Sequence, residues 1–502
     1  MNRLFLLISV FCLTITTTAG DIIVKNGGNL YEALRQAREW RRLADPRCEG
    51  GIHIILQAGR YYMNEPLLIR PEDSGTPTSP TIIRGENGAI VCGDPMQRHT
   101  QLFPQEGMLP ISDFNPSTRT ITIPTPPKNV LRTKHLEMVV HQRWAIAILR
   151  VKEMKTDGEK TIVSFLEPES RLEFEHPWPQ PVIGGEKGNS SFLLRTTEQR
   201  DGIEQLLTIC GTKEEPVSYL SFENITFENT CWNRPLHQGH VTLQGGFPII
   251  DAYKLPQEGL PWSATLENQA WIERPVAAVS VTGAYHVDFI GCHFNQLGST
   301  ALDYVNDVSD CTIRDNLFTD IGGTAILAGS FAESPREVHR PYSYLAAHCQ
   351  RLTISGNTIS VASAEDWGAV GIGCGYVRDV TIKGNDVCHV NYSGICVGWG
   401  WTPLYTGMER NHIIGNKVND YARQLYDTGG IYTLSNQPSS SIQDNEIGNP
   451  CPAPYATNDR AFQIYLDAET DGFVIKNNHC DGVTIGREQM GFNHPGKNMT
   501  IH

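Results

Sequence analysis

Two aspartates, Asp427 and Asp467, stand at the edges of hydrophobic, strand-like runs. A carboxylate in such a place faces a cleft or is paired, because burying an unpaired charge is costly. Two such carboxylates supply the proton donor and the nucleophile or base of glycosidic-bond hydrolysis. The alternative is that each aspartate caps backbone N–H groups in a turn. Polar and aromatic neighbours favour the catalytic interpretation: Tyr426, Tyr432, Gln437 and Tyr465.

Two tryptophans, Trp399 and Trp401, lie in the glycine-rich stretch GWGWTPLYTGM that precedes the aspartates. Residues i and i+2 of an extended chain share a face, so both indoles can point the same way. The flanking glycines remove local bulk, which favours an exposed platform that stacks against a sugar ring. Burial of both rings in the core is the alternative. Tyr392 is a further candidate for the wall of the same sugar subsite.

A second group of candidate residues consists of Glu365, Asp366 and Trp367. Two acids followed by an indole either line a cleft or form a solvated turn, and both interpretations stay open. As a catalytic pair, Glu365 and Asp366 compete with the two aspartates described above. His240, in the sequence HQGH, is a candidate for polar contacts with sugar hydroxyls, while a metal site is a weak interpretation because no third ligand follows.

Length and composition limit the class of protein. The chain has 502 residues, enough for more than one module, and its formal net charge of -14 argues against a nucleic-acid partner. The cysteines form no CxxC pair and no Cys/His cluster, so a zinc site is not expected. We expect no cofactor and no metal.

Residues 1–20 have the pattern of a secretory signal. Arg3 supplies the positive start, an apolar run follows, and Thr18-Ala19-Gly20 forms a small-residue exit. The apolar run is too short to span a bilayer, although an N-terminal membrane anchor is the alternative. With no second hydrophobic span, we expect an exported protein, periplasmic or secreted.

The elements that must position these residues repeat along the chain. The phrase apolar–x–Ile–x–x–Asn–x–apolar recurs in LTISGNTI, VTIKGNDV, HIIGNKV, SIQDNEI and FVIKNNHC. Short β runs at this period predict an all-β chain, a right-handed parallel β-helix with one coil per repeat. Asparagine tolerates the left-handed backbone of a tight turn, and its amide can bond the equivalent residue of the next coil. The repeated residues are Asn316, Asn357, Asn385, Asn416, Asn445 and Asn478.

The remaining segments divide the chain around this β-helix. Residues 21–100 are predicted to form an N-terminal cap and the first coils, 101–205 an inserted β-rich subdomain, and 206–502 the catalytic β-helix. Residues 449–461 are interpreted as a lid or rim loop. A capping helix is expected near residues 29–44, because apolar residues recur there at helical spacing. They are Leu30, Ala33, Leu34, Ala37 and Trp40.

Five segments together resemble glycoside hydrolase family 141, and the resemblance covers most of the mature chain. They are EDSGTPTSPTIIRG (72–85), PVAAVSVTGAYHVDFIGCHFNQLG (275–298), YSGICVGWGWT (392–402), LYDTGGIYTLSNQ (425–437) and IYLD (464–467). The resemblance implies a β-helix enzyme with α-L-fucosidase activity, or activity on xylan. It also implies that the catalytic pair is Asp427 and Asp467.

The sequence therefore predicts a monomeric, exported glycoside hydrolase that acts on a plant or algal polysaccharide or its oligosaccharides. Asp427 and Asp467 would be catalytic. Two alternatives stay open: a β-helix polysaccharide lyase, which needs an acidic Ca²⁺ cluster beside a strong base, and a non-catalytic glycan-binding β-helix. Residues expected to bind substrate are Asp366, Trp367, Tyr392, Trp399, Trp401, Tyr432, Gln437 and His240.

Overall fold

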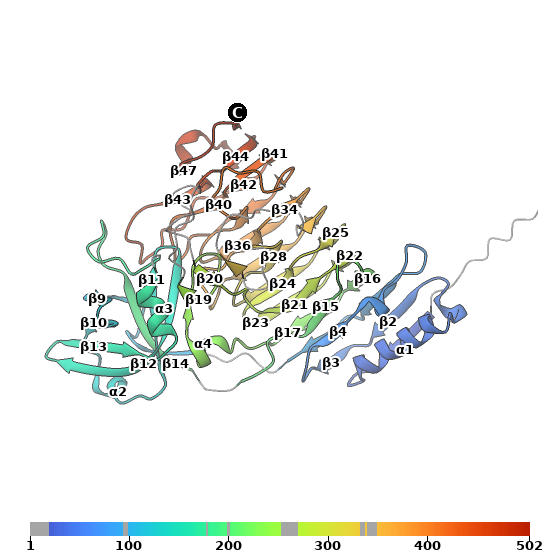
Figure 1. Ribbon diagram of the computed structural model, residues 1–502, viewed down its shortest axis with the longest axis horizontal. Coiled ribbons are helices and arrows are strands. Elements are labelled where there is room, and N and C mark those ends of the chain that lie inside the picture. Colours follow the sequence, from blue (N-terminus) through green and yellow to red (C-terminus); the bar gives the residue numbers. More distant parts are fainter. Residues whose placement is uncertain are drawn as a thin grey trace, which may run out of the picture.

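The computed structural model describes residues 20–93, 99–176, 179–197, 201–252, 270–331, 337–338 and 349–502. Its main body is a stack of coils, and each coil contributes strands to three parallel sheets (Figure 1). We call these the first, second and third sheets, in the order in which the chain meets them. The predicted parallel β-helix with an inserted β-rich subdomain is confirmed. The predicted signal lies outside the described residues except for Gly20.

The strands of the three sheets are short. The first sheet consists of β1 (Gly20–Val24), β2 (Ile52–Leu56), β5 (Thr81–Gly85), β16 (Val217–Glu223), β22 (Ala284–Ile290), β25 (Val308–Ser309), β26 (Thr312–Arg314), β30 (Cys349–Gln350), β31 (Thr353–Ser355), β34 (Val377–Arg378), β35 (Thr381–Lys383), β38 (His412–Ile414), β41 (Asn436–Gln443), β44 (Asp471–Lys476) and β48 (Thr500–Ile501). The second sheet consists of β3 (Gly59–Tyr62), β6 (Ala89–Cys92), β17 (Thr226–Glu228), β23 (His293–Leu297), β27 (Leu317–Ile321), β32 (Thr358–Ala362), β36 (Asp386–Val390), β39 (Lys417–Val418), β42 (Glu446–Ile447), β45 (His479–Cys480) and β46 (Val483–Thr484). The third sheet consists of β4 (Leu67–Ile69), β15 (Leu207–Cys210), β21 (Ala277–Thr282), β24 (Thr300–Tyr304), β28 (Ile326–Ala328), β33 (Ile372–Cys374), β37 (Ile395–Val397), β40 (Thr428–Thr433), β43 (Ala461–Leu466) and β47 (Met490–Phe492).

Alternating side chains from all three sheets fill the interior of the coil stack. Strand β2 shows the pattern, with every second residue buried, as the period of two in a strand requires. Aromatic residues stack from coil to coil inside it: the ring centroids of Phe222 and Phe289 are 4.8 Å apart, and those of Phe294 and Phe318 are 4.7 Å apart. The interior is therefore a packed core, and substrate can only bind outside it.

The turns from the first sheet to the second form a uniform edge. From β16 to β45, only two residues separate the last first-sheet strand of each coil from the following strand of the second sheet. The amide Nδ2 of Asn357 donates to Oδ1 of Asn385 at 2.9 Å, and Asn385 repeats this bond to Asn416 at 2.9 Å. The predicted amide ladder is confirmed. We call these turns the asparagine edge.

The sequence interpretation placed the left-handed backbone on the ladder asparagines, and this detail is wrong. The residue before each asparagine takes that conformation, with φ of 57° at Asp315 and 63° at Gly384. The asparagines themselves are buried, because their side chains must point inward to reach the next coil. Each turn therefore needs two residue types: one that tolerates positive φ, followed by one that carries an amide.

Helix α1 (Leu30–Arg42) covers the N-terminal end of the stack (Figure 1). The side chain of Asn29 accepts hydrogen bonds from the backbone N–H groups of Tyr31 and Glu32, which begins the helix. The five apolar residues predicted from helical spacing are the five that the helix buries. The helix thereby protects the open edge of the first coil from pairing with another chain.

The inserted subdomain leaves the β-helix between β6 and β15, in the connection from the second sheet to the third. Its antiparallel sheet contains β7 (His99–Phe103), β8 (Leu109–Pro110), β9 (Asp113–Asn115), β10 (Thr120–Pro124), β11 (Leu136–Gln142), β12 (Ala145–Asp157), β13 (Lys160–Phe165), β14 (Ser191–Thr197) and β18 (His240–Val241). A small sheet contains β19 (Ile249–Ala252), β20 (Ala270–Ile272) and β29 (Glu337–Val338). The remaining helices are α2 (Lys128–Leu131), α3 (Glu169–Glu175) and α4 (Arg234–Gln238).

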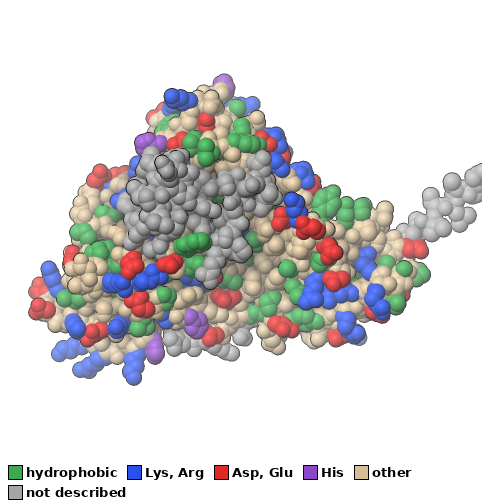
Figure 2. Space-filling model, viewed as in Figure 1, with side chains coloured by type: hydrophobic (Ala, Val, Ile, Leu, Met, Phe, Trp, Pro, Cys, Tyr) green, Lys and Arg blue, Asp and Glu red, His purple; other side chains and the backbone are tan. Residues whose placement is uncertain are grey.

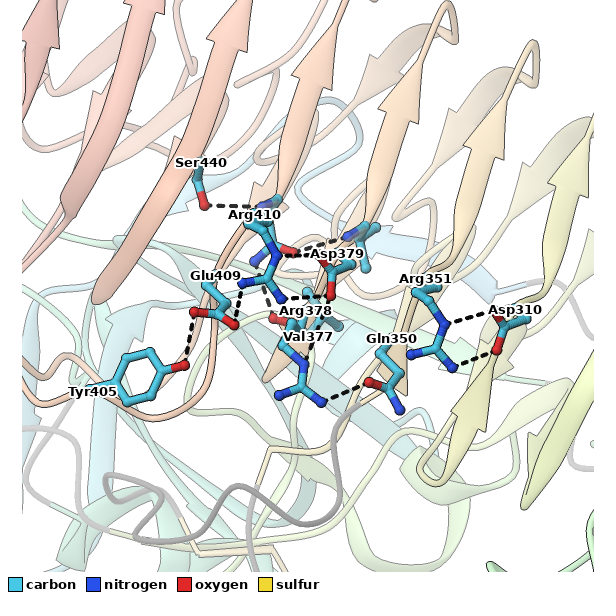
Figure 3. Close-up of polar contacts among 12 residues, drawn as sticks. Asp310, Gln350, Arg351, Val377, Arg378, Asp379, Tyr405, Glu409, Arg410 and Ser440 are labelled. Carbon is cyan, nitrogen blue, oxygen red and sulfur yellow. Dashed lines mark hydrogen bonds and ion pairs between the residues drawn. The ribbon is translucent and has the colours of Figure 1, made fainter.

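Ion pairs line the outer face of the first sheet. Figure 3 shows a ladder of ion pairs along the first sheet, in which Arg351 makes a bidentate pair with Asp310 and Arg410 makes one with Asp379. On the face seen in Figure 2, basic and acidic side chains are intermixed. Among the described residues, no helix combines the length and apolarity needed to cross a membrane.

Candidate active site

The two predicted aspartates lie on neighbouring strands of the third sheet. Asp427 directly precedes β40, and Asp467 directly follows β43. Between them, Tyr432 and Tyr465 are in register, and their rings meet edge to face with centroids 5.3 Å apart. The hydroxyl of Tyr465 donates to Oδ1 of Asp427 at 2.9 Å, while the hydroxyl of Tyr432 donates to Oδ2 of Asp467. The two tyrosines therefore hold both carboxyl groups against one surface of the sheet.

A cation holds the Asp427 carboxylate. Nε of Arg460 donates to Oδ1 of Asp427 at 2.9 Å, and the same guanidinium donates to the hydroxyl of Tyr465. The backbone of Asp427 has a φ of 59°, a left-handed value that aspartate tolerates better than most residues. Tyr392, which is buried, donates its hydroxyl hydrogen to the Asp427 carbonyl oxygen at 3.0 Å. These contacts fix the carboxylate and its backbone.

The environment of Asp467 favours the protonated acid. Its side chain is buried, and burial raises the pKa of this carboxyl group above its ordinary value, with the negative charge of Asp427 raising it further. Hydrogen bonds from Tyr432 and from Nδ2 of Asn493, the latter 2.7 Å long, act in the opposite direction. Two carboxyl groups in contrasting environments, one beside a cation and one buried, are what acid and base roles in one site require.

The prediction of an exposed indole platform is wrong. Trp399 and Trp401 are each only 4 % exposed. The Trp399 ring packs against Phe247 and Phe331, with centroids 5.2 and 4.7 Å away. Phe247 belongs to a turn that follows the inserted subdomain, so a segment more than a hundred residues away in sequence covers the tryptophans. The glycines that suggested exposure make room for this cover instead.

A small, mostly apolar cavity adjoins Tyr432 beneath this cover. Trp399, Phe247, Phe331 and Gln244 are among the residues that line it. Nε2 of Gln244 donates to the hydroxyl of Tyr432 at 3.2 Å, which links the cavity to the group that holds Asp467. Trp399 thus lines a small cavity and does not present an exposed ring for stacking.

Gln437 braces the backbone next to this cavity. The residue is fully buried, and its amide donates to the carbonyl oxygens of Val397 and Leu434, both at 3.0 Å. Its Oε1 accepts from Asn411 at 3.0 Å. These contacts give Gln437 a structural role at the start of β41, in place of the substrate contact predicted from its position in the sequence.

The second predicted group lies on an earlier coil, between β32 and β33. Nε2 of His240 is 3.0 Å from Oδ2 of Asp366, and both side chains are buried. Burial lowers the pKa of His240, whereas the Asp366 charge acts to raise it. Glu365 faces Arg195 at 3.5 Å, and the Trp367 ring stacks on Tyr455 with centroids 6.5 Å apart. The two adjacent acids are thus directed to separate partners rather than to each other.

The predicted rim loop, residues 449–461, lies in the connection from β42 to β43 (448–460) except for its last residue, which begins β43. Lys187 of the inserted subdomain forms an ion pair with Asp459, and the backbone N–H of Lys187 donates to the Thr457 carbonyl at 3.3 Å. Arg460 ends this connection, so contacts with the inserted subdomain steady the residue that holds Asp427. Within the described part of the chain, no group of three His, Cys, Asp or Glu side chains is placed to hold a metal ion.

Sequence reasoning missed Arg460 and Asn493, the charged and amide partners of the two aspartates. No pattern in the sequence marks either one, because each lies 26 or more residues after its aspartate and contacts it only once the coils have stacked. Gln244 was missed for the same reason: it lies 188 residues before Tyr432.

The parallel β-helix carries this pair of carboxyl groups on neighbouring strands, and its likeness to known proteins identifies the class of protein. A solved structure described as a glycoside hydrolase is 32% identical to this chain, covers 96% of each chain and superposes with a TM-score of 0.88. The GH141 insertion domain matches residues 92–201. The protein therefore belongs to glycoside hydrolase family 141.

More distant solved structures have low similarity. A complex of XylC with xylose is 10% identical, with a TM-score of 0.42 over 91% of this chain and 68% of that one. The A-module of the mannuronan C-5 epimerase AlgE6 from Azotobacter vinelandii is 11% identical, with a TM-score of 0.35 over 95% of each chain. No curated protein matches the sequence.

Proposed function

We propose that this glycoside hydrolase is an exported, α-L-fucosidase-like enzyme that acts on plant or algal polysaccharides or their oligosaccharides. Asp467 is the general acid, and Asp427 is the base or nucleophile. The observation that carries the proposal is the contrast between the two carboxyl groups on neighbouring strands, since one is buried with a raised pKa and the other is paired with Arg460. Membership of the family favours hydrolysis over elimination by a lyase.

The reaction follows from these roles. Asp467 transfers its proton to the glycosidic oxygen as the bond from that oxygen to the anomeric carbon breaks, so the leaving group departs as an alcohol. As this bond breaks, the Asp427 carboxylate either removes a proton from the water that attacks the anomeric carbon, or attacks that carbon itself. In the second case a glycosyl-enzyme forms, and water hydrolyses it while the Asp467 carboxylate takes the proton of that water. Arg460 and Tyr465 orient this carboxylate, and their hydrogen bonds cost no reorganisation during the reaction.

The apolar cavity beside Tyr432 supports a 6-deoxy sugar as the substrate. Its aromatic and aliphatic lining suits a methyl group, whereas the hydroxymethyl group of a hexose such as galactose would lose its hydrogen bonds there. A pentose such as xylose has no substituent at this position and would leave the cavity empty. Export is supported by the signal-like residues 1–20.

Aryl glycosides test both the sugar and the catalytic pair. We expect hydrolysis of an aryl α-L-fucoside and little of aryl β-xylosides or α-galactosides. Asp427→Asn and Asp467→Asn should each lower kcat by roughly 10²–10⁴-fold, because each removes a proton-transfer or nucleophilic group. Asp315→Asn is the matched control, since Asp315 and Asp427 have similar φ values of 57° and 59° and asparagine tolerates both.

Two results would contradict this proposal. Full activity of either aspartate variant on a cleaved substrate would remove that residue from the catalytic pair. Preference for a hexoside or pentoside would keep the pair but reject the deoxy-sugar specificity. The anomeric form of the first product, followed by NMR, distinguishes attack by Asp427 from attack by water.

A further inference from the structure

A second cavity, of about 290 Å³, lies between the inserted subdomain and the β-helix. One wall comes from α4 and β18, and the other from connections that lead into strands of the third sheet. Trp232 forms its aromatic part, so we call it the Trp232 cavity. Its volume is near the lower end of the range for small-ligand sites, roughly 300–1,000 Å³. It is large enough for one small polar ligand.

The Trp232 cavity is separate from the aspartate pair along the coil axis. Ser299 directly precedes β24, and Asp366 lies in the connection to β33; both line the cavity. In the third sheet, β24 is four strands from β40 and β33 is two strands from it. At about 4.8 Å per strand, the cavity wall lies about 10–19 Å along the axis from the strand that follows Asp427. A short oligosaccharide spans such a distance.

Two buried polar atoms of this cavity's lining residues lack partners in the described part of the chain. They are Nδ1 of His240 and Nε of Arg234. The His240 side chain is 2 % exposed and the Arg234 side chain 12 % exposed, so bulk water reaches neither freely. Native proteins leave few buried polar groups unpaired, and each one that is left calls for an explanation, such as an ordered water or an ion.

The basic side chains around the cavity already have acidic partners. Asp366 pairs with His240, and Glu273 accepts from Nη1 of Arg234 at 2.8 Å. Arg274 is neutralised by a bidentate pair with Asp303, which lies outside the lining. An anionic ligand, such as a uronate, would therefore have to break an existing pair. A neutral ligand that both donates and accepts hydrogen bonds meets no such cost.

Trp232 supplies an aromatic ring to the cavity lining. Its ring meets His240 edge to face, with centroids 4.7 Å apart, and the residue is only partly buried. An indole ring among carboxylates, an amide and a guanidinium matches the surface of a sugar, which has C–H faces and a rim of hydroxyls. Glu204, whose Oε1 accepts from the backbone N–H of Asn233 at 2.8 Å, supplies a further acceptor.

We propose that the Trp232 cavity is a second saccharide-binding site, which holds a neutral sugar unit of the oligosaccharide whose terminal unit is cleaved at Asp427 and Asp467. The identity of that oligosaccharide rests on the proposed function. Binding in the cavity does not, because it uses neither aspartate. The site would direct the enzyme to extended substrates rather than to isolated terminal linkages.

The test uses the inactive variant Asp427→Asn/Asp467→Asn on an array of neutral and uronate-containing plant and algal oligosaccharides. We expect neutral oligosaccharides to bind. Adding Trp232→Ala should weaken binding about tenfold, whereas Trp232→Phe should retain most of it. Glu273→Ala is a second test, because this partly exposed acid lines the cavity. Tyr62→Ala, which truncates an exposed aromatic residue at the N-terminal end, is the matched control and should change nothing.

Absence of oligosaccharide binding, or binding that neither Trp232→Ala nor Glu273→Ala weakens, would overturn the proposal. Binding of uronate-containing glycans alone would also overturn it, since the ligand would then be charged. On an aryl α-L-fucoside, the Trp232→Ala enzyme should keep its kcat and KM, which separates this site from the catalytic pair. If the aspartate variants retain activity, the proposed function fails, but the array still decides whether the cavity binds sugars.

Discussion

The asparagine edge and the edge where the second sheet meets the third differ in almost every respect. On the asparagine edge, two residues close every turn from β16 to β45. On the other edge, which we call the connection edge, the links range from the two residues between β23 and β24 to the whole inserted subdomain between β6 and β15. Asp366, Asp427 and Arg460 all lie on the connection edge.

The difference has a simple energetic origin. A ladder amide satisfies buried groups on both neighbouring coils, so an insertion in one turn would leave unpaired polar atoms in two others. The links of the connection edge run over the surface and satisfy their polar groups locally or through the inserted subdomain. One edge therefore fixes the spacing of the coils, and the other is free to carry chemistry.

Breaking the asparagine edge should have the largest effect on stability. Asn385→Ala removes the acceptor of two donors from Asn357 and leaves the Ile354 carbonyl without its amide partner. We expect the free energy of unfolding to fall by roughly 3 kcal/mol or more, measured by denaturant unfolding. Asn64→Ala, at an exposed position, is the control and should have little effect. Equal losses in the two variants would show that the ladder adds nothing special.

Breaking the connection edge should instead affect activity. Arg460→Ala removes the guanidinium that orients Asp427 and Tyr465, and kcat should fall by up to about 10²-fold while the unfolding free energy changes little. Arg460→Lys should recover only part of the activity, because an ammonium group keeps the charge but loses the planar fork. A change confined to KM would instead indicate that Arg460 contacts substrate.

A third prediction concerns how the stability cost of Asp467 depends on pH. The folded-state pKa of Asp467 is raised above its ordinary value of 3.8. The protonated side chain therefore makes its full contribution to the free energy of unfolding below that value, and this contribution is lost as pH rises through the folded pKa. Asparagine does not ionise, so at about pH 8 Asp467→Asn should be more stable than the unsubstituted protein, by about 1.4 kcal/mol for each unit of difference in pKa. The two proteins should converge near about pH 4. A less stable variant at the higher pH would contradict the assignment of Asp467 as the buried acid.

The smallest effect is expected on the outer face of the first sheet. Arg351→Ala breaks the pair with Asp310, in which the arginine side chain is 47% exposed. The unfolding free energy should fall by less than about 1 kcal/mol, and by still less in about 1 M salt, because water and ions screen exposed pairs. A loss as large as that of Asn385→Ala would mean that the ion-pair ladder, as well as the amide ladder, sets the coil spacing.

The repeating part of the protein could be predicted from the amino-acid sequence alone. The period of the asparagines predicted the β-helix and its amide ladder, because each repeat is a local unit that has to match only its two neighbours. The five buried residues of α1 followed from helical spacing alone. Resemblance to the family also placed the acids on Asp427 and Asp467, and the structure brings these two onto neighbouring strands.

The surroundings of the candidate site depend on contacts between segments that are far apart in the sequence. Trp399 and Trp401 are buried because Phe247 and Phe331 arrive from distant segments, which no local pattern of glycines reveals. Asp366 meets His240 across 126 residues, through the inserted subdomain. Strand periodicity determines on which face of a sheet a side chain lies, but the long links of the connection edge determine which residues pack against that face.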